Sequence, residues 1–246
     1  MLLLIADSVC GGFGQRDKKS FVHKSAESLG IDIWDESATG MSSSAYLDFL
    51  RTGNPLCPEQ QPPLSDLARV RVAVIALGNV DGKKTFKQKN FLGLLVPPRY
   101  RKEKIDPRPY YSSRRWKRYI EKTENIIRHA FRWYCHFTGN LHEHVSTKRT
   151  QENIIKILER FYEKKVILIS TSTTNNFYFP SAKRNYFITN NFLKEKSNNK
   201  DIVFYDMQSN INQDHLLADK FHLNAHGHDF LERDFRNLLA ETYKAK

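Results

Sequence analysis

Short runs rich in apolar residues recur along the chain and alternate with segments of helical periodicity. We expect five of these runs to be strands: 2–6, 31–35, 71–77, 165–170 and 201–206. Most of them are nearly continuous in apolar residues, which is typical of strands that are buried on both faces. The pattern therefore favours a parallel sheet that is covered by helices on its two sides.

The segments between these runs predict helices. One helix ends near Gly30, and another begins at a serine in 42–44 and ends at Gly53, because serine caps helix starts and glycine terminates helices. Three further helical patterns cover 116–134, 154–162 and about 226–243. We predict one α/β domain over residues 1–246, with a five-stranded parallel sheet, helices on both faces and an insertion at about 83–145.

Polar and glycine residues follow the predicted strands. Ser8 comes after the first strand, Gly40 beyond the second, 78–81 after the third and 171–176 after the fourth. In parallel α/β sheets the carboxyl ends of the strands meet at one edge, and functional groups collect there. We therefore expect these residues to lie within reach of one another.

Charge and cysteine content indicate the kind of partner and the cellular compartment. The chain has 246 residues, 39 lysines and arginines and 27 acidic residues, for a formal net charge of +12. This excess favours an anionic partner, whether nucleic acid, acidic glycan, nucleotide-linked ligand or membrane surface. The three scattered cysteines form no CxxC pair and fit a reducing compartment. With no apolar run of spanning length and no signal-peptide pattern at its start, we expect a cytoplasmic protein with no membrane span.

The sequence near the end of the chain offers a base for Ser8. Asp219 and His222 are three residues apart, just before the last helix. A serine hydroxyl needs a base to act as a nucleophile at neutral pH. His222 is that base in our interpretation, and the Asp219 carboxylate orients its imidazole.

These blocks together resemble the SGNH, or GDSL-type, hydrolases. The resemblance rests on Asp7-Ser8, Gly40, the sequence LGNVD at 77–81, and Asp219-x-x-His222 followed by Asn224 and Gly227. It implies a flavodoxin-like three-layer α/β sandwich that carries out ester hydrolysis or acyl transfer, often on carbohydrate O-acyl groups, without a metal. Carried over, it makes Ser8 the nucleophile, His222 the base and Asp219 its partner. The oxyanion hole would consist of the Ser8 and Gly40 N–H groups and the side chain of Asn79.

Two blocks depart from the usual pattern. Ala6 replaces the first glycine of Gly-Asp-Ser-Leu, and Asn79 stands one residue earlier than in Gly-x-Asn-Asp. The shift puts the asparagine donor of the oxyanion hole in question, and loss of one such donor costs about 10²–10³ in rate. Asn175 or Asn176 is an alternative donor.

Weaker candidates have plainer interpretations. Cys10 is a nucleophile or a buried filler, and we favour the filler. The His142 and His144 pair lies in a predicted loop without zinc spacing. Gly11, Gly12 and Gly14 lack the spacing of a dinucleotide loop. We expect no metal and no cofactor, although acetyl-CoA would be needed by a transferase.

The most basic segment, 97–118, lies in the predicted insertion and interleaves arginine with aromatic residues. The residues that we predict to contact substrate are Arg99, Arg101, Arg114, Arg115 and Trp116. Arginine forks bind phosphate or carboxylate, and aromatic rings stack on sugars or bases. An anionic glycan or acyl-CoA, a nucleic acid, and a merely solvated basic face all remain open. Resemblance to SGNH-like proteins of polysaccharide loci favours a glycan over nucleic acid.

Together these features predict an enzyme. Ser8 would form an acyl-enzyme with an O-acylated, most simply O-acetylated, carbohydrate, and water would release the acyl group. An O-acetyltransferase in capsule or surface-polysaccharide biosynthesis, working with the same triad, is the alternative. A second alternative is a non-catalytic protein that binds an anionic polymer or nucleic acid on a degenerate hydrolase fold.

Overall fold

A computed structural model of the protein describes residues 1–13, 15, 18–101, 106–107, 109–172, 179–180 and 182–245. Its main sheet has five parallel strands in the order β2-β1-β3-β6-β7. Their bounds are β1 Leu2–Ala6, β2 Ile33–Asp35, β3 Val72–Ala76, β6 Lys165–Ile169 and β7 Ile202–Tyr205. Each lies inside a run predicted from the sequence, and the flavodoxin-like order confirms the predicted fold class.

The sheet divides the core into two layers because successive side chains of a strand point to opposite faces. Leu2, Leu4 and Ala6 of β1 belong to one buried cluster. Leu3 and Ile5 belong to the other. All five residues of β1 are fully buried, so this strand contributes side chains to both layers.

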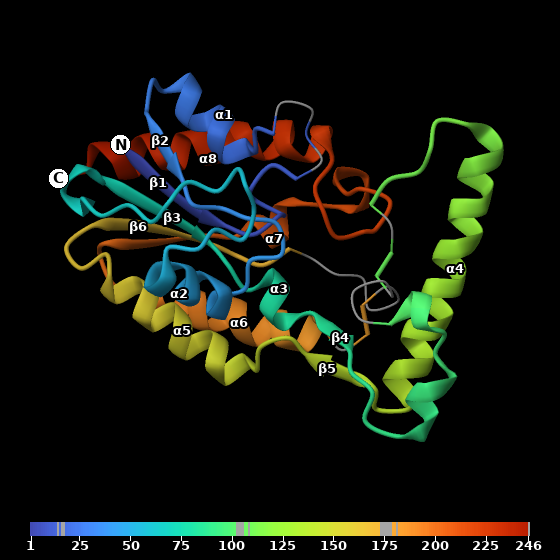
Figure 1. The fold of residues 1–246 in the computed structure, drawn as a ribbon. Coiled ribbons are helices and arrows are strands. Elements are labelled where there is room, and N and C mark those ends of the chain that lie inside the picture. Colours follow the sequence, from blue (N-terminus) through green and yellow to red (C-terminus); the bar gives the residue numbers. More distant parts are fainter. Residues whose placement is uncertain are drawn as a thin grey trace.

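Helices cover both faces of the sheet (Figure 1). On one face, α1 (Phe21–Ser28) packs against α8 (Ala225–Lys244). On the other lie α2 (Ser43–Thr52), α5 (Thr147–Glu159) and α6 (Ala182–Lys196). Helix α6 was not predicted from the sequence. As predicted, Ser42 caps α2 through its side chain, and Gly53 follows that helix in the left-handed conformation.

Several short elements complete the described chain. They are α3 (Asn79–Gly82), α7 (Met207–Asn210) and the 3₁₀ turns Leu67–Arg69, Phe91–Leu95, Pro98–Tyr100 and Gln213–His215. Every described helix is too short or too polar to cross a bilayer.

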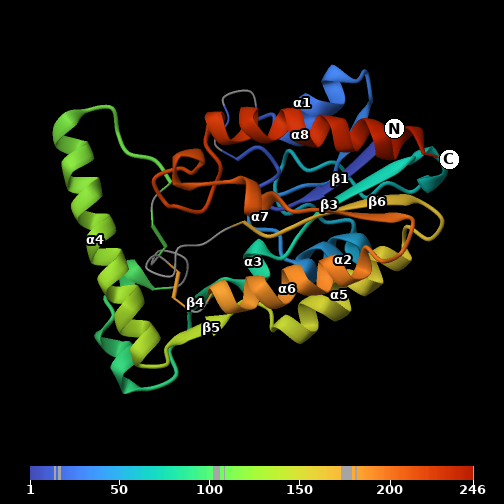
Figure 2. The ribbon, with the colours of Figure 1, turned by 180° about the vertical axis from the view of Figure 1, so that it is seen from behind.

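The insertion after β3 forms a separate layer beyond the carboxyl edge of the sheet. Its base is an antiparallel pair of β4 (Lys84–Phe86) and β5 (Leu141–Glu143). Its main element, α4 (Arg115–Phe137), stands apart from the sheet in both views (Figures 1 and 2). The prediction of a loop at 141–144 was wrong, since most of that segment is β5.

One carboxylate holds the insertion together. Asp106 pairs with Lys83, at the end of α3, and with Arg132 of α4. The Arg132 side chain is 1% exposed, and it also donates a 2.7 Å hydrogen bond to the carbonyl oxygen of Lys84. This buried cation is balanced by Asp106, which thereby links α4 to the strand at the base of the insertion.

We predict that Asp106→Ala destabilises the insertion by about 3 kcal/mol, because removing one partner leaves the Arg132 charge buried without compensation. Limited proteolysis should then cut within 97–118 faster than in the unmodified protein. Asp48→Ala is the matched control, since the Asp48–Arg51 pair is exposed and such pairs contribute about 0–1 kcal/mol. Equal proteolysis of both variants would contradict the assigned role of Asp106.

Candidate active site

Ser8 lies in the turn that immediately follows β1, an inner strand of the sheet. Asp7 shapes this turn, since its side chain accepts from the Val9 N–H at 3.0 Å and its carbonyl oxygen accepts from the Gly11 N–H at 2.8 Å. Gly12 has a φ of +81°, and a Cβ there would lie 2.4 Å from the Lys18 carbonyl oxygen. The glycines after Ser8 thus allow the chain to fold back closely over the strand end.

A second tight turn presents His222. The backbone N–H of Leu217 donates to the carbonyl oxygen of His222 at 2.7 Å, and Lys220 between them has a φ of 57°. Within the turn, Asp219 Oδ1 accepts from the N–H groups of Phe221 and His222 at 3.0 and 3.1 Å. The other oxygen, Oδ2, lies 2.6 Å from His222 Nδ1. The three-residue spacing therefore lets one carboxylate fix both the backbone and the ring.

The two turns meet through a hydrogen bond between side chains 214 positions apart. Ser8 Oγ lies 2.9 Å from His222 Nε2. Because the Asp219 carboxylate is an acceptor, the Nδ1 of the ring carries the donated proton, and Nε2 is left to accept from the Ser8 hydroxyl. The structure thus brings together the three residues Ser8, His222 and Asp219 that the sequence singled out, in the arrangement of a serine–histidine–aspartate triad.

Aromatic rings enclose the imidazole, and sequence analysis missed them. The rings of Phe13 and His222 are 4.5 Å apart, and Phe221 stands edge-on to the imidazole at 5.0 Å. Tyr110 of the insertion reaches the outer side of Phe13, with 6.2 Å between ring centroids. The backbone N–H of Ala218 also donates to the Pro109 carbonyl oxygen at 3.2 Å. The insertion therefore touches the histidine turn directly.

A buried carboxyl lies next to the nucleophile. Asp7 is fully buried, and burial raises its pKa to about 7. Its Oδ1 accepts from Val9 and from the Asn79 amide at 3.3 Å. No described residue donates to its Oδ2. The proton that this oxygen gains near neutral pH reduces the cost of burying a charge.

The predicted oxyanion donors differ in how they are placed. Asn79 is 1% exposed, and besides donating to Asp7 it accepts from the Ser172 N–H at 2.6 Å. Its amide has a second N–H. Gly40 lies in the turn after β2 with a φ of +76°, beside Thr39, which lines the pocket next to Ser8. The alternative donors Asn175 and Asn176 lie outside the described residues.

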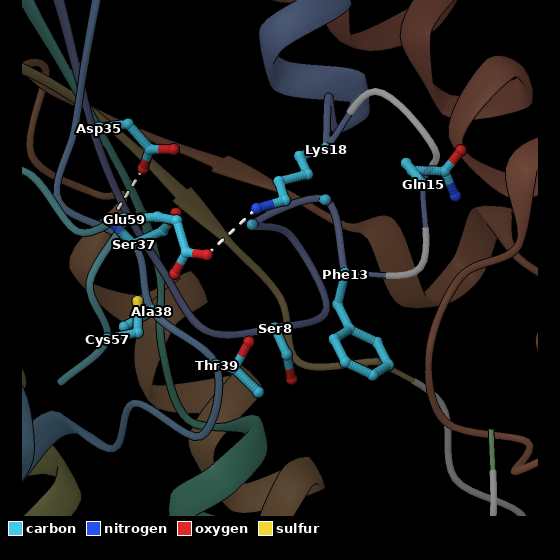
Figure 3. A pocket seen from close by; sticks show the side chains of 12 residues that line it. Ser8, Phe13, Gln15, Lys18, Asp35, Ser37, Ala38, Thr39, Cys57 and Glu59 are labelled. Atoms are coloured by element: carbon cyan, nitrogen blue, oxygen red, sulfur yellow. Dashed lines mark hydrogen bonds and ion pairs between the residues drawn. The ribbon is translucent and has the colours of Figure 1, made fainter.

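A pocket of about 300 Å³ opens beside Ser8 (Figure 3). Its lining combines polar side chains with apolar surface and consists of Ser8, Gly11, Gly12, Phe13, Gln15, Lys18, Asp35, Ser37, Ala38, Thr39, Cys57 and Glu59. The charged groups of this lining are paired, Lys18 with Glu59 at 3.2 Å and Asp35 with His23 at 3.1 Å. The pocket thus offers hydrogen-bonding groups with little net charge.

The five basic and aromatic residues predicted to contact substrate do not line this pocket. They are Arg99, Arg101, Arg114, Arg115 and Trp116. Arg101 donates to the backbone carbonyl oxygens of Leu94 and Val96, and Arg99 stacks on Tyr100 with 4.5 Å to the ring centroid. The other three are exposed at the start of α4. The five residues therefore lie outside the lining of the pocket beside Ser8.

The alternative nucleophile, Cys10, is buried in the core. Its thiol faces the Met207 sulfur at 3.9 Å, and burial raises its pKa well above the ordinary value. A protonated thiol without access to solvent is not a nucleophile, so the filler interpretation of Cys10 fits its place in the fold.

Comparison with solved structures identifies the fold. The lipase/acylhydrolase from Enterococcus faecalis is similar with a TM-score of 0.58 and 13% identity, over 100% of this chain and 97% of that chain. An acetylxylan esterase from Geobacillus stearothermophilus, solved as a catalytic mutant, has a TM-score of 0.56 and 14% identity, over 98% and 93% of the two chains. A GDSL-like lipase from Bacteroides thetaiotaomicron has a TM-score of 0.54 and 13% identity, over 98% and 87%. The sequence matches no protein-family model and no curated protein. The chain therefore has the GDSL, or SGNH, hydrolase fold, as the sequence resemblance implied.

The raised pKa of Asp7 predicts a pH-dependent stability. The folded protein holds this proton more tightly than the unfolded chain, so the contribution of Asp7 is complete below its ordinary pKa of 3.8 and is lost as the pH rises toward about 7. Between about pH 5 and pH 7 this loss should amount to roughly 2–3 kcal/mol.

Asp7→Asn should remove that dependence, because the amide keeps an acceptor oxygen for the Val9 N–H and never ionises. Urea unfolding of both proteins at several pH values measures the difference. Parallel pH profiles for the two proteins would show that Asp7 does not titrate in this range.

Proposed function

We propose that this protein is a serine-dependent ester hydrolase that removes short acyl groups, acetyl above all, from carbohydrate. The observation that carries the proposal is the relay Ser8–His222–Asp219, with contacts of 2.9 and 2.6 Å. It lies at the carboxyl edge of a parallel sheet and beside an open pocket.

The reaction follows from the geometry of the relay. His222 Nε2 takes the Ser8 proton as Oγ attacks the ester carbonyl carbon, and Asp219 stabilises the imidazolium that forms. When the tetrahedral intermediate collapses, the imidazolium protonates the leaving sugar oxygen and the acyl group stays on Ser8. His222 then takes a proton from water, the resulting hydroxide attacks the acyl-enzyme, and the carboxylic acid leaves as Ser8 regains its proton.

We assign the oxyanion to the backbone N–H groups of Ser8 and Gly40 and to the second amide N–H of Asn79. Support for Asn79 comes from its position: the carboxyl that precedes Ser8 holds the amide at 3.3 Å. Asp7 and Ser172 together orient this side chain, so the displaced motif still brings the amide to the serine turn.

The pocket supports a carbohydrate rather than a lipid ester. Amide, hydroxyl and charged groups of its lining bind sugar hydroxyls, whereas a long acyl chain would bury them without partners at a cost of about 1–3 kcal/mol each. One protein of similar fold is an acetylxylan esterase, whose name indicates the same kind of ester.

We predict that Ser8→Ala and His222→Ala each lower kcat for an acetylated oligosaccharide, and for an aryl acetate, by about 10³-fold or more. Asp219→Ala should lower kcat by about 10²–10⁴-fold, because the imidazole loses its orienting partner. His226→Ala is the control, since this histidine is exposed on α8. A fluorophosphonate should label Ser8 and no other serine, as intact mass and peptide mapping would show. Unchanged hydrolysis by the Ser8 and His222 variants would refute the proposal.

Acyl length gives a second prediction. We expect kcat/KM for acetyl esters to exceed that for octanoyl esters of the same alcohol by about tenfold or more, because a long acyl chain would bury the polar side chains of the pocket lining. A lipase-like preference for the longer chain would contradict the carbohydrate assignment but leave the serine relay intact. Gain of acetyl by an oligosaccharide incubated with acetyl-CoA, followed by mass spectrometry, would identify transfer in place of hydrolysis.

A further inference from the structure

Helix α4 buries one polar side and leaves much of its apolar surface exposed. Glu121, Asn125, His129 and Arg132 are buried at helical spacing. The apolar face of α4 consists of Trp116, Tyr119, Ile120, Ile126 and Phe137, which are between 54% and 79% exposed. These residues are additional to Ile127, Phe131, Tyr134 and Cys135, which α4 packs into the small apolar core of the insertion. An ordinary surface helix directs its apolar residues to the core and exposes polar ones.

The neighbouring 3₁₀ turn extends this apolar face. Phe91, Leu94 and Leu95 of that turn are 75%, 58% and 65% exposed. Leu95 and α4 together line an apolar groove of about 280 Å³. Exposed apolar side chains thus gather on two neighbouring elements of the insertion, and such a concentration is typical of an interaction site.

Basic residues flank the surface, and among the described residues no carboxylate pairs with them there. The exposed cations of the described insertion are Lys87, Lys89, Arg99, Arg114, Arg115, Lys117, Arg118 and Lys122. The three described carboxylates between 83 and 140 are all engaged inside the insertion: Asp106 with Lys83 and Arg132, Glu121 with the Ser112 N–H, and Glu124 with Arg128. The exterior of this part of the chain is therefore apolar and cationic.

The start of α4 lacks the charge that a helix start favours. Arg114, the N-cap residue, makes no side-chain cap, and the first turn contains no acidic residue. Arg115, Lys117 and Arg118 lie there instead, next to the positive end of the helix dipole. Anionic groups placed at this end would interact favourably with the helix dipole and would reduce the mutual repulsion of the cations.

We propose that the apolar face of α4 docks the protein on an anionic lipid bilayer, with the helix lying in the plane of the interface. Aliphatic and aromatic side chains enter the boundary between headgroups and acyl chains, and the flanking cations bind lipid phosphates. The carboxyl edge of the sheet, with Ser8 and His222, then lies on the side of α4 that faces away from the lipid.

Two other occupants fit this surface less well. A second copy of the chain on a two-fold axis would bring two cationic surfaces together, since such an interface joins the same patch of both subunits. A single-stranded nucleic acid stacks its bases on aromatic rings, but Ile120, Ile126, Leu94 and Leu95 offer no ring. The aliphatic content and the charge together favour lipid.

The test is co-sedimentation of the whole protein with vesicles. We expect binding to phosphatidylcholine vesicles containing roughly one third phosphatidylglycerol to be about tenfold or more stronger than to phosphatidylcholine alone, and to weaken as salt is added. Ile120→Ser with Ile126→Ser, and separately Lys117→Gln with Lys122→Gln, should each reduce binding by about tenfold or more. Because these side chains are exposed, the thermal unfolding of the variants should match that of the unmodified protein.

The matched control is Tyr162→Ser with Phe187→Ser, two apolar side chains that are 81% and 64% exposed on the α/β body. This control should bind vesicles like the unmodified protein. Absence of vesicle binding, or equal loss in the control, would overturn the proposal. So would a dimer in light scattering that the isoleucine variants dissociate, or tight RNA binding that they abolish, if no vesicle binding accompanies either result.

Discussion

Parallel pairing of β1 with both neighbours is the constraint on which the rest of the structure depends. The register joins Leu2 to Ile33 on one side and to Val72 on the other. A shift of one residue would move Leu3 and Ile5 to the opposite helical layer, so burial on both faces fixes the register firmly. Because β1 cannot slip, the turn after it places Ser8 at a set height above the sheet edge, where His222 meets it.

The orientation of the His222 ring is the second requirement of the site, and contacts within the histidine turn satisfy it. Asp219 uses one oxygen for two backbone N–H groups and the other for the imidazole. The ring is therefore oriented by the same contacts that fold the turn. Only the distance between the two turns depends on the tertiary fold, and α8, which begins at Ala225 and packs against α1, holds that distance. Because the Asp219–His222 contact forms within one turn, the spacing of these two residues is informative in a sequence even though Ser8 lies near the other end of the chain.

Sequence analysis located the five strands because their burial requires continuous apolar residues. It located the relay because its residues occur in the chain order of the resembled hydrolases, and because Ser8 follows a strand at the carboxyl edge of the predicted sheet. Helix α6 was missed for a physical reason: its buried side alternates apolar residues with Asn185, Thr189 and Asn190. Asn185 donates to the Gly82 carbonyl oxygen at 3.1 Å, and Asn190 accepts from the Thr171 N–H at 2.8 Å. Polar residues at these buried positions interrupt the apolar periodicity. Likewise the contact of Phe13 with His222 arises from a loop conformation that no local pattern encodes.

The insertion also shows what apolar periodicity cannot predict. The spacing of Trp116 and Ile120 predicts a helix correctly, but not which side of it faces inward. The side of α4 that faces inward depends on the partners available to it, because Asp106 and a backbone carbonyl oxygen bind Arg132 on the side opposite to Trp116 and Ile120. The insertion also has a small apolar core, to which α4 contributes Ile127, Phe131, Tyr134 and Cys135. The exposed apolar residues of α4 lie outside that core, and their position beside exposed cations agrees with a partner outside the chain.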